Sequence, residues 1–172
     1  LKDTFYVAAK EIIAWHDNAV DPEDHLLTVG PQLTWMDTKF TPRSGKPVEN
    51  NALWHGALSL MSQWGRDLND PAAGEYQAQG DDVRDSFRAK FWNPQRECLY
   101  DLLTPEGPVA QLRPNQIFAV SLPFGLLDQA QARAVVRLVE RGLLTPVGLR
   151  PLEATHPASK PRSERPPPEH AR

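Results

Sequence analysis

The chain has 172 residues, with 19 Lys and Arg against 22 Asp and Glu, a net charge of -3 and one cysteine. This length is that of one domain or part of one, and the mild charge argues against a nucleic-acid partner. A single cysteine excludes an internal disulfide, no apolar stretch is long enough to span a bilayer, and the first residues lack the features of a signal peptide, so we expect a cytoplasmic protein without a membrane partner.

The composition favours helices. Leu and Ala far outnumber Val and Ile, and β-branched residues lose more side-chain freedom in a helix than Leu or Ala do. We therefore predict an all-α fold. The chain starts at Leu1, within a pattern that is already helical, so we expect it to be cut from something longer.

Residues 2–18 are predicted to form the first helix, because apolar side chains recur there at helical spacing. These residues are Phe5, Ala8, Ala9, Ile12, Ile13 and His16.

Residues 21–46 lack any sustained hydrophobic period, and a connection of that length in a compact domain is usually functional or disordered. This loop contains Trp35, Met36 and Phe40, which are residue types that disordered segments rarely carry. We predict a functional loop.

Four further helices follow from the apolar pattern. In the second of these, Val83, Phe87 and Phe91 stand four residues apart and form one face. In the last, Asp128 and Gln131 have the spacing of a capping box. The four ranges are 47–69, 74–92, 114–122 and 128–143. The short run 98–103 is interpreted as a strand or an extended turn.

The last part of the chain differs in composition. After Leu152 the sequence is rich in proline, and Ala is its only aliphatic residue. Such a segment cannot bury enough apolar area to offset the entropy cost of ordering it. We predict a folded domain over residues 1–152 and a disordered tail over 153–172, and a disordered end is favoured over a proline-rich ligand for a partner module.

Two polar clusters are candidates for a site. In the loop, Trp35 stands beside Asp37 and upstream of Arg43 and Glu49, a combination typical of sugar-processing sites, where an aromatic ring packs on the sugar and a carboxylic acid protonates the glycosidic oxygen. The alternative is that Trp35 fills the core and Asp37 caps a turn.

The second cluster lies at the start of the predicted helix 114–122. Arg113, Asn115 and Gln116 converge there with backbone N–H groups. Simple capping of the helix would explain Asn115 alone, and a solvated helix end commonly carries such residues, so this alternative stays open.

The sequence contains no motif for metal binding, phosphate binding or a serine nucleophile. The five histidines are scattered, and none pairs with Cys or a carboxylate at metal-ligand spacing. The sequence contains neither a phosphate-binding glycine loop nor a Gly-x-Ser-x-Gly elbow. We predict no metal and no cofactor.

Eight segments occur in this order in the glycogen-debranching, amylo-α-1,6-glucosidase family, and the chain resembles that family over roughly residues 1–158. The loop and both polar clusters are among them. The eight segments are 33–37, 41–43, 45–49, 51–54, 91–93, 99–101, 113–119 and 143–150.

The resemblance implies an (α/α)6 toroid of paired helices that hydrolyses α-1,6-glucosidic branch bonds of an α-glucan or branched oligosaccharide with inversion, using two carboxyl groups. Asp37 matches the position of the general acid, and Trp35 is the sugar platform. The other positions to which the resemblance assigns substrate binding are Arg43, Glu49, Arg113, Asn115 and Gln116.

The chain also departs from the family pattern. It has helices for about half of a toroid, and the proline-rich tail stands where the second catalytic carboxylate is expected. Glu49 or Asp101 as a substitute base is disfavoured. We therefore expect a fragment with little or no activity. The alternatives are a non-catalytic α-glucan-binding or scaffold fragment and, ranked last because no His falls in the cluster, a sugar epimerase or isomerase.

Overall fold

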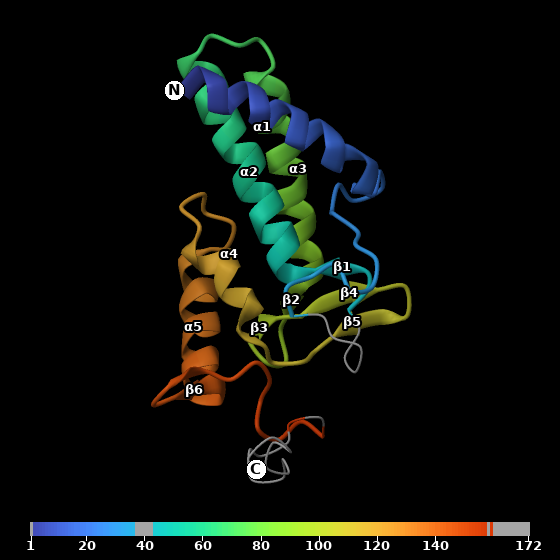
Figure 1. Ribbon diagram of the computed structural model, residues 1–172. Coiled ribbons are helices and arrows are strands. Elements are labelled where there is room, and N and C mark those ends of the chain that lie inside the picture. The colour runs from blue at the N-terminus through green and yellow to red at the C-terminus, as the bar shows by residue number, and fades with distance from the viewer. Residues whose placement is uncertain (1, 37–42, 158, 160–172) are drawn as a thin grey trace, which may run out of the picture.

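The computed structural model describes residues 2–36, 43–157 and 159, and Figure 1 shows the arrangement of its elements. These residues are mostly helical, and they include three small antiparallel sheets. In order, the elements are α1 (Lys2–His16), η1 (Asp17–Ala19), β1 (Lys46–Pro47), α2 (Val48–Asp67), α3 (Ala73–Phe91), β2 (Trp92–Asn93), β3 (Cys98–Leu99), β4 (Leu102–Thr104), β5 (Gly107–Val109), η2 (Pro114–Ile117), α4 (Phe118–Ser121), α5 (Gln129–Leu143), β6 (Leu144–Thr145) and β7 (Gly148–Leu149).

The predicted helices are all present, and their bounds lie within a few residues of the expected ones. The predicted helix 114–122 is the 3-10 helix η2 followed by the short α4. The all-α prediction is incomplete, because it omits sheets of order β1-β4-β5, β2-β3 and β6-β7. The run 98–103, interpreted as a strand or an extended turn, contains β3 and the first two residues of β4. The strands are only two or three residues long, which is too short to produce a sustained alternation of apolar and polar residues.

The antiparallel pair of α2 and α3 forms the centre of the structure (Figure 1). Val83, Phe87 and Phe91 are buried, as their spacing predicts, and the rings of Phe87 and Phe91 stack with centroids 4.5 Å apart. Leu58 of α2 is also fully buried. These side chains belong to one buried apolar cluster that joins α2 to α3, and the candidate site forms where α2 begins.

Helix α1 packs on α2 with only part of its apolar surface. Ile13 is buried, whereas Phe5 and Ile12 from the same predicted set are exposed. Lys10 forms an ion pair with Asp70 in the turn between α2 and α3, with 2.8 Å between Nζ and Oδ2. The outer side of α1 is therefore an exposed apolar surface.

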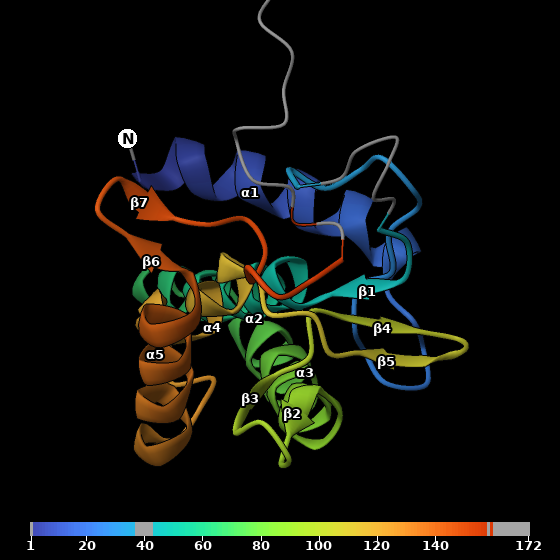
Figure 2. The same ribbon diagram turned by 90° about the horizontal axis from the view of Figure 1, so that it is seen from below.

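Helix α5 lies beside η2 and α4, at the other side of the structure from α1 (Figure 2). The predicted capping box is confirmed: the Asp128 carboxylate accepts a hydrogen bond from the Gln131 N–H at 2.8 Å, and the Gln131 side chain accepts one from the Asp128 N–H. This pair stops the chain from fraying where α5 begins.

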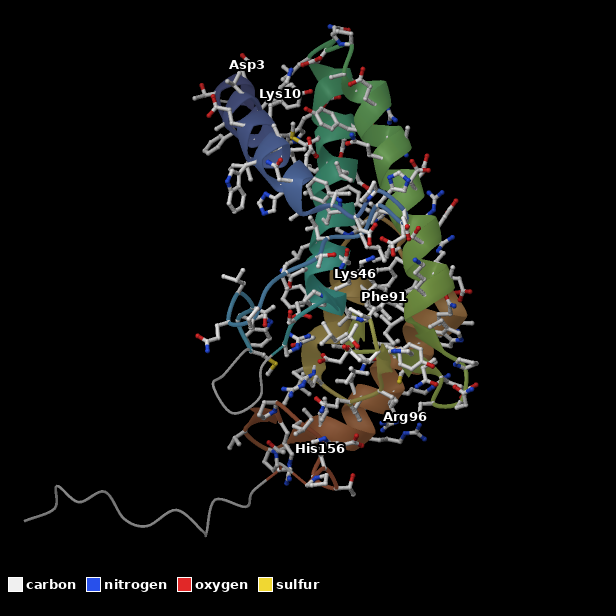
Figure 3. The ribbon with its side chains drawn as sticks, turned by 90° about the vertical axis from the view of Figure 1, so that its right-hand side faces the viewer. Asp3, Lys10, Lys46, Phe91, Arg96 and His156 are labelled. Carbon is white, nitrogen blue, oxygen red and sulfur yellow. The ribbon has the colours of Figure 1, made fainter. Side chains whose placement is uncertain are left out.

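The segment after α5 returns to the folded part of the chain. Leu152 is buried, and Glu153 forms an ion pair with Arg96, with 2.9 Å between Oε2 and Nη2. Figure 3 labels Arg96 near the end of the molecule where residue His156 also lies. The boundary predicted between residues 152 and 153 stays a prediction, as does disorder of the tail.

Two further features concern the whole of the described chain. The side chain of Cys98 is a buried free thiol, 3% exposed. Within residues 2–36, 43–157 and 159, no helix combines the length and the apolar character that crossing a membrane requires.

Candidate functional site

The functional loop predicted from the sequence is closed at its base by a backbone pair. The Val29 N–H donates to the Gly45 carbonyl at 2.7 Å, and the Gly45 N–H donates back to the Val29 carbonyl at 3.0 Å. Gly45 has a φ of +126°, and a Cβ there would lie 2.3 Å from the carbonyl oxygen of Leu103. Only glycine fits this backbone and this close approach to β4.

Arg43 is the centre of a buried cluster at this base. Its Nε donates to Asp101 Oδ2 and its Nη2 to Asp101 Oδ1, both at 3.0 Å. On its other side it donates from Nη2 to Glu49 Oε2 at 2.9 Å and from Nη1 to Glu49 Oε1. The guanidinium therefore joins two carboxylates, one from the first turn of α2 and one from the connection between β3 and β4.

Arg113 and Asn115 complete the cluster from η2. Arg113 Nε lies 3.5 Å from Asp101 Oδ2, and Asn115 Nδ2 donates to Asp101 Oδ1 at 3.2 Å. Asn115 is fully buried, and its Oδ1 has no hydrogen-bond partner among the residues that the structure describes. Neither side chain caps η2, so the capping alternative for this cluster is wrong.

The four charged groups of the cluster balance each other. Arg43 and Glu49 are 3% and 1% exposed, and Asp101 and Arg113 are equally buried. Burial acts to lower the pKa of Arg43, but its hydrogen bond to Glu49 and the charges of Asp101 and Glu49 outweigh this and raise the pKa. Burial raises the pKa of Asp101, and the positive charges of Arg43 and Arg113 oppose that shift. Such a set is held together by mutual neutralisation, and removal of one member leaves a buried charge without its partner.

The cluster also fixes part of the loop. Arg43 Nη1 donates to the hydroxyl of Thr34 at 3.2 Å. The next residue, Trp35, is 65% exposed, so the alternative in which it fills the core is wrong. Arg43 therefore holds the loop at the residue that precedes an indole ring facing solvent.

Gln116 has a different environment from Asn115. Its Oε1 accepts from the N–H of Leu99 at 3.2 Å, and its Nε2 donates to the carbonyl of Arg113 at 3.3 Å. Both ends of its amide thus bond to the backbone around the cluster. The family resemblance assigns Gln116 to substrate binding, whereas in the structure its side chain is buried and bonds to the backbone of Leu99 and Arg113.

Asp37, the predicted general acid, lies outside the described residues. Asp101, in contrast, is a site residue that the candidate list lacks. Its segment was among the family-like motifs, and it follows the buried strand β3 directly. Its partner Arg43 is 58 residues away in the sequence, so no local spacing connects the two.

A metal centre finds no support in this part of the molecule. Across residues 2–36, 43–157 and 159, there is no group of three or more His, Cys, Asp or Glu side chains placed to hold an ion. The acidic residues of the cluster are bound to arginine instead.

Comparisons with solved structures show a shared fold. A sialidase superposes with a TM-score of 0.73 and 14% identity, covering 91% of this chain and 15% of its own. A GH78-family rhamnosidase of Bacillus sp. GL1 superposes with a TM-score of 0.66 and 13% identity, covering 86% of this chain and 15% of its own. The chain thus spans a small part of either protein. No curated protein matches the sequence.

The comparison with family models agrees with the resemblance found in the motifs. The model described as amylo-alpha-1,6-glucosidase matches residues 5–170, which includes the loop, the buried cluster and nearly all of the proline-rich segment. The chain belongs to the amylo-alpha-1,6-glucosidase family.

Proposed function

We propose that this chain is part of a glycoside hydrolase that cleaves α-1,6-glucosidic branch bonds of an α-glucan, with Asp37 as the general acid. The observation that carries the proposal is the buried Arg43 cluster. Arg43 of this cluster bonds to Thr34, so the cluster holds the two residues that bracket the segment of Trp35 and Asp37 in a chain of this family. A general acid must be held at a constant, short distance from the glycosidic oxygen that it protonates, and a loop anchored in this way can hold it there.

Trp35 and Asn115 are proposed to contact the sugar. The exposed indole of Trp35 offers an apolar face to a sugar ring. The buried Oδ1 of Asn115, which lacks a partner among the described residues, supplies an acceptor for an ordered water, and its proposed contact with the sugar runs through that water. Arg113 stands beside Asn115 and is proposed as a third contact.

Arg43, Glu49 and Gln116 are proposed to act as positioning residues rather than direct contacts. The guanidinium of Arg43 is engaged by Glu49, Asp101 and Thr34, and the amide of Gln116 bonds to the backbone. Their role is to hold the loop and η2 in one arrangement.

The base of an inverting hydrolase must lie about 6.5–9.5 Å from the acid and activate a water molecule. Glu49 and Asp101 do not suit this task, because both are buried and bound to Arg43. We infer that neither residue is the base. On this account the chain by itself binds α-glucan and turns it over slowly at best.

The helical arrangement is proposed to be part of an (α/α)6 toroid. The antiparallel pair of α2 and α3 is the type of unit from which such a ring is built, and the likeness to part of a sialidase and part of a rhamnosidase supports the proposal. The exposed apolar side of α1, with Phe5 60% and Ile12 58% exposed, supports the presence of a further packing layer.

The test is glucose release from a branched limit dextrin by the wild-type chain and by Asp37→Asn. Loss of the general acid is expected to reduce the slow release by about 100-fold or more. Asp3→Asn, which changes an exposed carboxylate at the start of α1, is the matched control and should leave the rate unchanged. Equal rates for wild type and Asp37→Asn would remove Asp37 from the mechanism.

A second candidate is a non-catalytic α-glucan-binding or scaffold protein. The observation in its favour is that both described carboxylates of the cluster are neutralised by Arg43. Calorimetry with maltooligosaccharides separates the two candidates: heat of binding with no glucose release supports the binding protein, whereas release that depends on Asp37 supports the hydrolase.

A further inference from the structure

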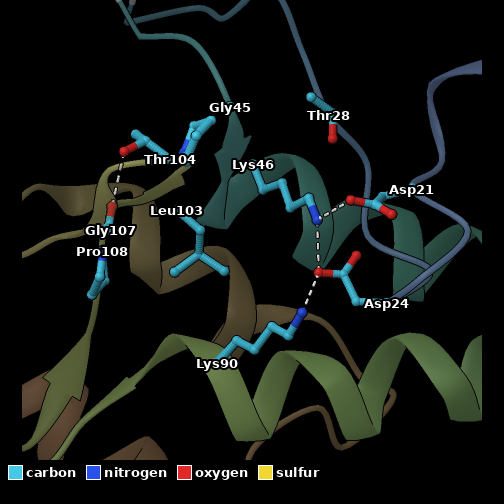
Figure 4. Close-up of a pocket in the computed structure, with 11 residues that line it drawn as sticks. Asp21, Asp24, Thr28, Gly45, Lys46, Lys90, Leu103, Thr104, Gly107 and Pro108 are labelled. Carbon is cyan, nitrogen blue, oxygen red and sulfur yellow. Dashed lines mark hydrogen bonds and ion pairs between the residues drawn. The ribbon is translucent and has the colours of Figure 1, made fainter.

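A cavity of about 490 Å³ lies apart from the Arg43 cluster, between the β4–β5 hairpin and the end of α3 (Figure 4). Its walls come from segments that are distant in the sequence: residues 21–28, β1, the end of α3 and the hairpin. This volume is within the range of small-molecule sites in proteins, roughly 300–1,000 Å³. Figure 3 places Lys46, one of its lining residues, near the ends of α2 and α3.

One wall of the cavity is a row of paired charges. Asp24 is buried, and its Oδ2 accepts from Lys46 Nζ at 2.7 Å and from Lys90 Nζ at 2.6 Å. Lys46 also donates to Asp21 Oδ2 at 2.6 Å. Burial acts to raise the pKa of Asp24, but its hydrogen bonds to Lys46 and Lys90 outweigh this and lower the pKa. Ion pairs join the two carboxylates to the two ammonium groups, and the four formal charges of the row cancel.

This row retains hydrogen-bonding capacity toward the cavity. Each ammonium group has three N–H donors, of which Lys46 uses two and Lys90 uses one in the bonds above. Lys90 is 48% exposed at its side chain. Asp21 keeps acceptor positions, and Thr28 adds a hydroxyl that both donates and accepts. Donors and acceptors thus alternate along one wall.

The opposite wall is apolar. Leu103, Pro105 and Pro108 line it together with Gly107, and Figure 4 shows this hairpin facing the row of lysine and aspartate side chains. Thr104 donates its hydroxyl to the Gly107 carbonyl at 2.9 Å, which closes the hairpin turn. The cavity therefore has a polar side and an apolar side that face each other.

The charge pattern selects one class of ligand. The carboxylates of Asp21 and Asp24 would repel a phosphate or carboxylate ligand. The ammonium groups of Lys46 and Lys90 would repel a cationic ligand. A neutral polyol avoids both conflicts, because each hydroxyl can accept from an ammonium group and donate to a carboxylate. A sugar ring also presents an apolar face, which suits the hairpin wall.

We propose that this cavity is a second carbohydrate site, which binds a neutral glucosyl unit of an α-glucan chain. The choice of glucose rests on the proposed function, whereas the choice of a neutral polyol rests on the cavity alone. Only Ser44 and Gly45 separate Lys46 from Arg43 in the sequence, so this short segment connects the cavity with the buried cluster.

The experiment is a titration of the isotopically labelled full chain with maltotriose, followed by amide resonances. The resonances of Thr28, Lys46 and Gly107 should shift with a dissociation constant of about 1 mM, as is usual for a short neutral sugar. Lys90→Gln removes the charge and part of the donor set, and should weaken binding at these resonances about tenfold. Arg137→Gln, an exposed cation on α5, is the control and should leave it unchanged.

Other outcomes overturn the proposal. Shifts confined to Trp35 and Asn115 would leave the proposed function standing without a second site, and no shift at tens of millimolar maltotriose would remove the site outright. Shifts at Thr28 and Lys46 with inorganic phosphate but not with maltotriose would make it an anion site. Should Lys90→Gln lose its native spectrum, Thr28→Trp fills the cavity mouth instead and must abolish the shifts at Lys46 and Gly107.

Discussion

Arg43 and Asp101 face each other through two parallel hydrogen bonds of 3.0 Å, although 58 residues separate them in the sequence. Paired bonds of this type fix the orientation of both groups as well as their distance. Because Arg43 also holds Glu49 and Thr34, a single guanidinium connects the start of α2, the β3–β4 connection and the functional loop. The arrangement of the candidate site depends on this side chain.

Replacement of Arg43 is expected to be strongly destabilising. Arg43→Ala leaves the buried carboxylate of Glu49 without its partner and that of Asp101 with only Arg113 and Asn115, and should lower the free energy of unfolding by about 3–5 kcal/mol. The matched control is Arg84→Ala, since Arg84 pairs with Asp81 and Asp85 at the surface of α3 and should lose less than about 1 kcal/mol. Urea denaturation of both variants measures the difference, and similar losses would mean that the cluster adds no special stability.

Gly45 and Gly74 should respond to alanine in opposite directions. Gly45→Ala forces a side chain to within 2.3 Å of the Leu103 carbonyl at a positive φ, and should cost about 2 kcal/mol or more. Gly74→Ala meets no atom within 4 Å in the first turn of α3, and should stabilise the helix by about 0.5–1 kcal/mol. Thermal unfolding gives both values. A harmless Gly45→Ala would show that the close approach of β1 to β4 is relaxed in solution.

His55 is predicted to make stability depend on pH. Burial, together with the positive charges of Arg84 and Arg88, lowers its pKa from 6.5 to about 4, while Asp81 opposes the shift. Above pH 6.5 the imidazole is neutral in both states and stability is complete. Between pH 6.5 and 4 only the unfolded chain takes up the proton, so the free energy of unfolding falls, in total by about 3 kcal/mol.

His55→Phe removes this titration. Its stability should vary less than that of the wild type between pH 6.5 and 4, as measured by urea midpoints at several pH values. His25→Asn, at an exposed position with positive φ that Asn tolerates, is the control and should keep the wild-type dependence. An unchanged pH profile in His55→Phe would assign the acid sensitivity to other groups.

Trp35 should affect binding without affecting stability. Its ring is 65% exposed, so Trp35→Ala is expected to change the free energy of unfolding by no more than about 0.5 kcal/mol. Loss of a stacking platform should weaken maltooligosaccharide binding about tenfold. Trp15→Ala, at a ring 73% exposed on α1, is the matched control. Calorimetry that finds equal affinities for the two variants would exclude Trp35 from the sugar site.

Local signals predicted much of the fold. The four-residue spacing of Val83, Phe87 and Phe91 identified the buried face of α3, and the pair Asp128 and Gln131 identified the start of α5. These features act over one or two helical turns, so they are readable in the sequence itself. Of the strands in the three small sheets, only β3 and most of β4 fall in a run, 98–103, that the sequence indicated as a strand or an extended turn. Strands of two or three residues are too short to show a sustained alternation.

The site was predictable only in part, for a physical reason. Exposure of Trp35 and burial of Asn115 depend on how distant segments pack, and the sequence left both alternatives open. Asp101 acquires its role from Arg43, far along the chain. Similarly, the row formed by Asp24, Lys46 and Lys90 joins three separate elements, and no local pattern indicates that they meet.

The most direct test of the account is the anomeric form of the glucose released from a branched limit dextrin, followed by proton NMR before mutarotation. A general acid at Asp37 in an inverting site predicts that β-glucose appears first and that Asp37→Asn reduces its formation by about 100-fold or more. Initial release of α-glucose, or release at the wild-type rate by Asp37→Asn, would contradict it.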